Sequence, residues 1–186
     1  DVEEGDGDRR LVARELRAVD HEATVELLRY LRYHDSQVGE VRLYRRPDGG
    51  LFDLLTDPRA ATVEHRPGPM VRLVDAERAL AALDYPEDAS ATLTVAVDDG
   101  FAEWNDATLR LAVEGGRATC ERLGGSESGA AHADATVGIG ALSQLAVGYR
   151  SASRLHEVGR LDADASTVGV LEALFPEGDP VVHERF

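Results

Sequence analysis

Two neighbouring segments of the chain alternate strictly between apolar and polar or small residues, and this pattern limits the folds that the chain can adopt. Residues 92–97 place leucine or valine at every second position, and residues 108–113 do the same. Such alternation is typical of strands with one buried face. Asp-Asp-Gly (98–100) ends the first segment, and Glu-Gly-Gly (114–116) turns the second into residues 117–123. The pattern predicts an antiparallel meander.

The region around this meander predicts an α+β domain over residues 70–186. A short strand over 71–74 and a helix capped by Asp75 are expected before it, and a mobile glycine-rich loop (124–129) and a strand (133–139) after it. Apolar spacings of three and four then indicate helices at 141–148, near 151–157 and at 165–174. Strands followed by helices are typical of the α+β class.

The N-terminal part predicts an incomplete second domain. Residues 1–8 are too polar to form a core and are expected to be a disordered lead-in. A strand over 11–19, a helix that begins after Asp20 and a strand over 38–44 are predicted next. The apolar stripe of this helix contains Ala23, Leu27, Leu28 and Leu31. Because three elements cannot close an α/β layer, residues 9–69, with their proline-rich connector, are interpreted as a partial domain.

The charge of the chain excludes several functions. Its 20 Lys and Arg residues are all arginine, and 35 Asp and Glu residues bring the formal net charge to −15. Without lysine there is no Schiff-base chemistry and no phosphate-loop lysine. The acid excess argues against nucleic acid and anionic membranes as partners. Two explanations of the composition stay open: a salt-rich cytoplasm that screens the carboxylates, or a GC-rich genome that favours arginine.

Other residues give little support for a catalytic or metal site. No apolar run is long enough to span a membrane and no leader is visible, so a cytoplasmic protein is expected. The six histidines are scattered and no metal site is predicted. Cys120 is interpreted as a small buried side chain. The acidic pairs 98–99 and 162/164 are interpreted as turn and cap residues. Trp104-Asn105 is interpreted as packing at the sheet edge, with a ligand role as the alternative.

Several segments follow one another along the chain in a recognisable order. Those of the later domain are 71–85, 101–116, 133–152, the Gly-Arg-Leu step at 159–161 and the closing Phe186. In order and spacing they resemble the carboxy-terminal part of the enhanced intracellular survival acetyltransferases. The stretch 9–57, with Leu-Leu-Thr-Asp-Pro-Arg at 54–59, resembles the end of that family's middle acetyltransferase-like domain.

The resemblance implies two domains of the GNAT acetyltransferase fold followed by a sterol-carrier-like α+β domain. It places the acetyl-coenzyme A site in the first GNAT domain, whose pyrophosphate loop nothing here matches. This chain is therefore expected to be the C-terminal half of a GNAT-like domain plus the sterol-carrier-like domain, without a cofactor site and inactive alone. The intact protein is expected to acetylate primary amines of aminoglycosides or lysine side chains, and to assemble as a hexamer.

The resemblance also implies a role for the end of the chain. The terminal carboxylate of Phe186 is expected to act as general base toward the acceptor amine, with Glu184 and Arg185 as substrate-binding neighbours. Arg185 stands where a carboxylate would better attract a polycation, which argues against aminoglycosides. A frayed terminus is the alternative for this segment. For the whole chain, the alternatives are a sterol-carrier-like module for an apolar ligand and a scaffold for oligomerisation.

Overall fold

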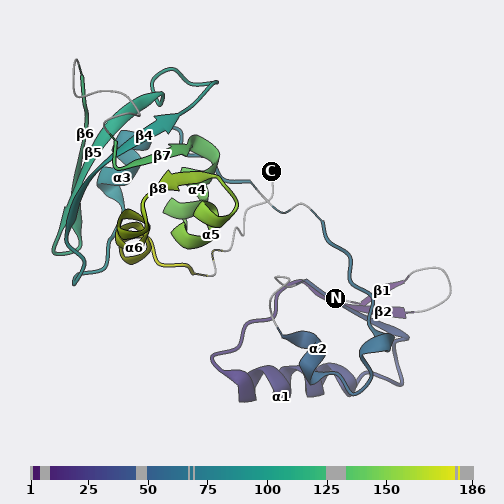
Figure 1. The fold of residues 1–186 in the computed structure, drawn as a ribbon. Helices are drawn as coiled ribbons and strands as arrows, with labels where there is room; N and C mark the ends of the chain where they lie inside the picture. Colours follow the sequence, from purple (N-terminus) through teal and green to yellow (C-terminus); the bar gives the residue numbers. More distant parts are fainter. Residues whose placement is uncertain are drawn as a thin grey trace. The chain divides into compact units, whose positions relative to one another are not determined.

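The computed structural model describes residues 2–4, 9–44, 50–66, 68, 70–124, 133–178 and 180. The chain divides into two compact units, 1–67 and 68–186, which are treated separately below (Figure 1). Among the residues described, no helix has both the length and the apolar composition that a bilayer crossing requires.

Unit 1 contains a three-stranded sheet in the order β1-β2-β3 (Val2–Glu4, Arg9–Ala13 and Glu40–Leu43). Strands β2 and β3 are parallel, with Leu11 opposite Val41. A parallel pair needs a crossover, and helix α1 (His21–Arg32) provides it. The predicted cap of this helix is confirmed, because the Asp20 side chain accepts a hydrogen bond from the Ala23 N–H at 2.8 Å.

Two predictions for unit 1 are corrected. The lead-in is not disordered at residues 2–4, which pair antiparallel with β2. Backbone pairing of this kind does not require apolar side chains. The strand predicted over 11–19 ends at Ala13, because its partner β3 has only four residues. A short helix α2 (Leu51–Leu54) and a 3₁₀ turn (Pro58–Ala60) follow. Among the residues described in unit 1, only Val12 is buried.

Unit 2 contains a five-stranded sheet in the order β6-β5-β4-β7-β8. The predicted antiparallel meander is confirmed as β4 (Ala91–Asp98), β5 (Ala107–Glu114) and β6 (Arg117–Arg122). Strand β7 (Ala135–Gly138) pairs parallel to β4, so the sheet is mixed. The unpredicted strand β8 (Leu161–Ala163) pairs antiparallel to β7.

The described residues of unit 2 also form four helices: α3 (Ala76–Ala82), α4 (Ile139–Ala146), α5 (Ala152–Glu157) and α6 (Ala165–Leu174). The apolar side chains of β4 and β5 form a single core with Leu80, Leu142, Leu155 and Leu171 of the helices. The core therefore lies between one face of the sheet and the helices (Figure 1).

The predicted strand over 71–74 is wrong, because polar side chains of other elements bind the backbone of this segment. The Leu73 N–H donates to the Ser143 hydroxyl at 3.0 Å. The Val74 carbonyl accepts hydrogen bonds from the Trp104 indole at 2.7 Å and from the Asn105 amide at 3.1 Å. Residues 71–74 are therefore a connector fixed to the body of unit 2.

Candidate functional site

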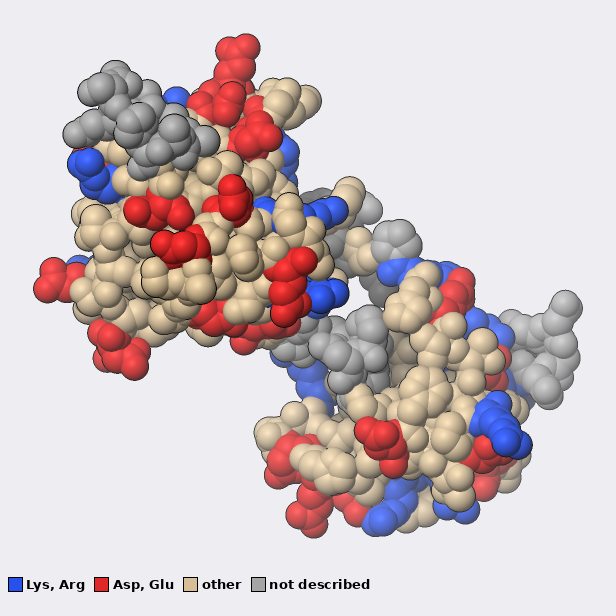
Figure 2. Space-filling view, in the orientation of Figure 1, with Lys and Arg blue, Asp and Glu red and all other residues tan. Residues whose placement is uncertain are grey.

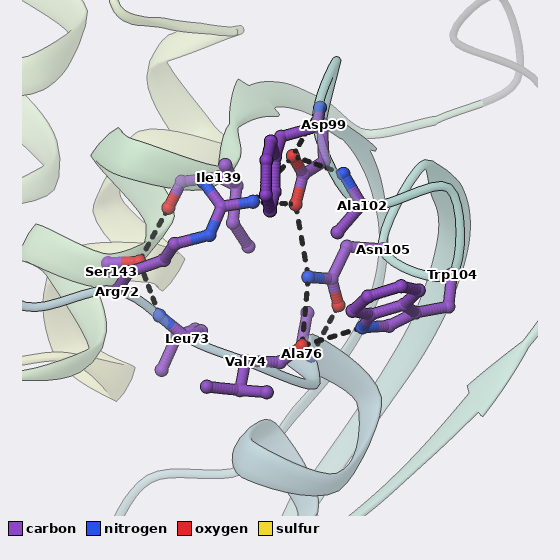
Figure 3. Close-up of polar contacts among 11 residues, drawn as sticks. Arg72, Leu73, Val74, Ala76, Asp99, Ala102, Trp104, Asn105, Ile139 and Ser143 are labelled. Carbon is purple, nitrogen blue, oxygen red and sulfur yellow. Dashed lines mark hydrogen bonds and ion pairs between the residues drawn. The ribbon is translucent and has the colours of Figure 1, made fainter.

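The connector is held by a buried carboxylate at the end of β4 (Figure 3). Asp99 is 4% exposed, and both of its oxygens accept hydrogen bonds from one Arg72 nitrogen, at 2.7 and 2.6 Å. The N–H groups of Phe101 and Ala102 donate to Oδ1, and the Asn105 amide donates to Oδ2 at 3.0 Å. Each of these contacts stabilises the ionised form of Asp99.

Asn105 links this carboxylate to the start of α3. It is 2% exposed, and its Oδ1 accepts a hydrogen bond from the Ala76 N–H at 2.9 Å. Its Nδ2 donates to both the Val74 carbonyl and Asp99. The neighbouring Trp104 is 56% exposed, and its indole donates to the same Val74 carbonyl. The polar contacts of Asn105 fix this end of the sheet.

The electrostatics of Asp99 point to anchoring rather than catalysis. Burial alone would raise the pKa of this carboxyl, but the donors from Arg72, Asn105 and the backbone outweigh it and hold the pKa well below its usual range. A carboxylate that stays ionised in this way is a poor proton donor at neutral pH. The structural interpretation of Asp99 is therefore confirmed, and that of Asp164, which caps α6, is confirmed as well.

Several large apolar side chains are exposed in the segments that carry this anchor. The Arg72 guanidinium lies 5.4 Å from the centre of the Phe101 ring, which is 85% exposed. Other large exposed apolar residues of the same segments are Met70, Val71, Val74 and Trp104.

A second feature is the point where the chain leaves α6. The Gly178 N–H donates to the Gly148 carbonyl at 2.8 Å, which fixes residues 176–178 against the end of α4. Gly148 has a φ of +67°, and a Cβ there would lie 3.0 Å from the Pro176 oxygen. A cavity of about 390 Å³ borders this contact. Its lining includes Leu83, Tyr85, Leu145, Leu174, Phe175 and Pro180.

The predicted site residues Glu184, Arg185 and Phe186 lie outside the described residues, as does the glycine-rich loop beyond Gly124. Within the described ranges, no group of His, Cys, Asp and Glu could hold a metal ion. Cys120 is half-buried rather than fully buried. Burial and then the charges of Glu77, Glu121 and Asp75 raise its pKa to about 11, so it is not an activated nucleophile.

Sequence reasoning missed the partnership of Arg72, Asp99 and Asn105. The local signal is the Asp99-Gly100 step after a strand, with Asn105 six residues beyond the aspartate. Nothing local indicates that Asp99 pairs with Arg72, which lies 27 positions away.

Comparisons with known proteins match both parts of the chain. The family described as acetyltransferase (GNAT) domain matches residues 1–73, and the family described as sterol carrier protein domain matches residues 76–183. An uncharacterised N-acetyltransferase of Streptomyces griseus is 34% identical over 137 residues, which are 73% of this chain and 31% of the relative. The chain thus spans about a third of the length of that relative.

Two solved structures are similar to this chain over nearly its whole length. Eis1 of Mycobacterium abscessus is 30% identical, with a TM-score of 0.66 over 96% of this chain and 43% of that one. A GCN5-related N-acetyltransferase of Anabaena variabilis has a TM-score of 0.72 over 96% of this chain and 44% of that one, and its 21% identity supports the fold alone. The chain belongs to the sterol carrier protein domain family through residues 76–183, and it carries a GNAT acetyltransferase domain before that region.

Proposed function

We propose that this chain is the C-terminal portion of an N-acetyltransferase of the enhanced intracellular survival type, which transfers an acetyl group from acetyl-coenzyme A to a primary amine. The observation that carries the proposal is the similarity to Eis1 over 96% of the chain, together with the two matched families in this order. The proposed division is a partial GNAT-like domain over 9–69 and a sterol-carrier-like domain over 70–186.

The start of helix α1 in unit 1 does not fit acetyl-coenzyme A. A pyrophosphate binds where free N–H groups of a helix start face a glycine-rich loop. At the start of α1, the Asp20 carboxylate already accepts from the Ala23 N–H, and Glu22 adds a second negative charge in the first turn. Both charges repel a pyrophosphate. We therefore place the cofactor in another part of a longer protein and expect this chain alone to be inactive.

In this proposal the end of the chain supplies a base. The carboxylate of Phe186, with a reference pKa of about 3.5, is ionised at neutral pH and takes a proton from the ammonium group of the acceptor. Glu184 and Arg185 lie next to it in sequence and would contact the acceptor. The positive charge of Arg185 favours lysine side chains or other small amines over polycationic aminoglycosides. The last contact described before this end is the hydrogen bond from the Gly178 N–H to the Gly148 carbonyl.

We further propose a cytoplasmic homo-oligomer, a hexamer by the family resemblance. Helix α1 of unit 1 has no buried residue despite its apolar stripe, and Leu27 is 36% exposed. A helix with this pattern normally packs its apolar side against a partner.

An apolar-ligand module is the second candidate function. The cavity of about 390 Å³ beside residues 174–178 favours it, because most of its lining is apolar. A tunnel for an apolar ligand between the sheet and the helices is not favoured. Leucine side chains fill that region, and four of them are almost fully buried: Leu109, Leu142, Leu145 and Leu155.

The test uses the longer protein and this chain in parallel. One glycine added after Phe186 displaces the carboxylate and leaves the cofactor site unchanged, so acetylation of a primary amine should fall by about a hundredfold or more. This chain alone should show no turnover with acetyl-coenzyme A. A glycine-extended protein that keeps its rate within about twofold would remove Phe186 from the mechanism, and turnover by this chain alone would place the cofactor site within it.

A further inference from the structure

Three arginines of unit 2 converge on one small pocket at the ends of α4 and α5. Arg150, Arg154 and Arg160 line a cavity of about 300 Å³. The other lining residues are Gln144, Leu155 and Val158. This volume is at the lower end of the range for small-molecule sites.

Two glycine turns of the same kind bring the arginines together. Gly148 ends α4 with a φ of +67° and Gly159 follows α5 with a φ of +69°. After the first turn, the N–H groups of Tyr149 and Arg150 return to the Gln144 carbonyl. After the second, the Arg160 N–H donates to the Leu155 carbonyl at 2.8 Å. Each turn folds the chain back over the last helical turn, so both arginines reach one cavity.

Two of these positive charges have no carboxylate partner among the described residues. Arg154 pairs with Glu157 at 3.0 Å. The Arg150 guanidinium lies over the Tyr149 ring, 4.5 Å from its centre, and contacts the tyrosine hydroxyl at 3.4 Å. Within the described part of the chain, neither Arg150 nor Arg160 forms an ion pair, and the Arg160 side chain makes no hydrogen bond.

Helix capping does not explain the cluster. Arginines near helix ends often bind the last carbonyl groups, but among the described contacts the guanidinium groups of Arg150 and Arg160 make none of these bonds. The ends of α4 and α5 together contribute a charge of about −1 at most. The net positive charge of three guanidinium groups and the Glu157 carboxylate is larger than this negative charge, so the pocket stays positive.

The cluster contrasts with the rest of the domain. Residues 70–186 contain 20 acidic residues and nine arginines, and three of those nine line this pocket. Figure 2 shows acidic side chains spread over the face of unit 2 that it displays. Like charges gathered in one hollow of an acidic protein repel each other, and a bound anion relieves that repulsion.

We propose that this pocket binds the phosphate group of a small molecule. A phosphate carries up to two charges and three or more acceptor oxygens, and it suits several guanidinium forks at once. Val158, which is 48% exposed and lines the pocket, would contact the carbon part of a phosphomonoester. The hollow is too small for a protein surface, which makes an acidic surface of a second copy the less suited occupant.

The test is calorimetric titration of the 186-residue chain at low salt, with inorganic phosphate and with glycerol phosphate as probes. Arg150→Gln and Arg160→Gln should each weaken binding about tenfold or more, and Arg160→Lys should restore part of it. Arg78→Gln is the matched control, because it removes the same charge from an exposed position on α3 outside the pocket and should change binding less than about twofold. Circular dichroism melting of each variant establishes that it is folded.

Two positive outcomes distinguish the source of the phosphate group. Equal affinity for both probes indicates a site for the free ion, and tighter binding of glycerol phosphate indicates a phosphomonoester. The proposal is overturned if neither probe saturates the chain at a concentration of about 10 mM, because that concentration is well above the dissociation constants of ordinary small-molecule sites. It is also overturned if Arg78→Gln weakens binding as much as Arg160→Gln, or if Arg160→Gln changes only the mass of the particle in sedimentation.

Discussion

Replacement of Asn105 with alanine tests whether the connector anchor stabilises unit 2. The change removes three hydrogen bonds and leaves the buried Ala76 N–H without its acceptor. Val74 keeps a bond from Trp104, and Asp99 keeps its bonds from Arg72 and the backbone. The unpaired N–H therefore dominates, and the total loss should be about 3 kcal/mol.

That loss corresponds to a fall of roughly 10 °C in the Tm of a domain of this size. Thermal unfolding is followed by far-ultraviolet circular dichroism on the 186-residue chain. Trp104→Phe is the control, since it removes only an exposed donor to the same carbonyl and should lose less than about 1 kcal/mol. A Tm for Asn105→Ala within about 2 °C of the parent would refute the anchor.

Four shorter predictions concern other parts of the fold. Gly148→Ala should destabilise the chain more than Gly159→Ala in urea titrations, because both require a positive φ, which disfavours alanine by about 1–2 kcal/mol, and only the first puts a Cβ 3.0 Å from a backbone oxygen. Iodoacetamide should alkylate Cys120 in the folded chain roughly a hundredfold more slowly than in the unfolded chain at mildly alkaline pH, because its pKa of about 11 suppresses the thiolate. The pKa of Asp99 is lower in the folded state, so its contribution is present above the unfolded value of about 3.9 and is lost as the pH falls through the folded value; acid titration should therefore destabilise the parent more steeply than Asp99→Asn. The net charge of −15 predicts a Tm that rises from low to molar potassium chloride, and a Tm independent of salt would contradict the self-repulsion argument.

Local periodicity was sufficient to predict the main elements of unit 2. The meander and α6 were predicted because alternation and helical spacing are written into each segment by itself. The three-residue strand β8 was missed because so short a segment has no detectable period, and its pairing with β7 depends on tertiary contacts. Residues 71–74 have the composition of a strand, but their partners are Ser143, Trp104 and Asn105.

The polar features of unit 2 were harder to predict, because their partners are also distant in sequence. A carboxylate in an Asp-Gly turn has the same local sequence whether it is exposed or paired with Arg72. The arginine pocket could be suspected only from two helices that each end in glycine with an arginine close behind, at 148–150 and 159–160. Neither segment by itself shows that the two turns border one cavity, because the position of the turns depends on how α4 and α5 pack.

One buried helix, α4, contacts both the segment by which the chain enters unit 2 and the segment by which it leaves α6. In its middle, α4 carries Ser143, a fully buried residue whose hydroxyl donates to the Ile139 carbonyl at 2.6 Å and accepts from the Leu73 N–H. At its end, Gly148 accepts the hydrogen bond from Gly178. The segment that enters the domain and the segment that leaves it are therefore both fixed to the same rigid element, less than three helical turns apart. The packing of α4 therefore fixes both the connector that enters unit 2 and residues 176–178 where the chain leaves α6.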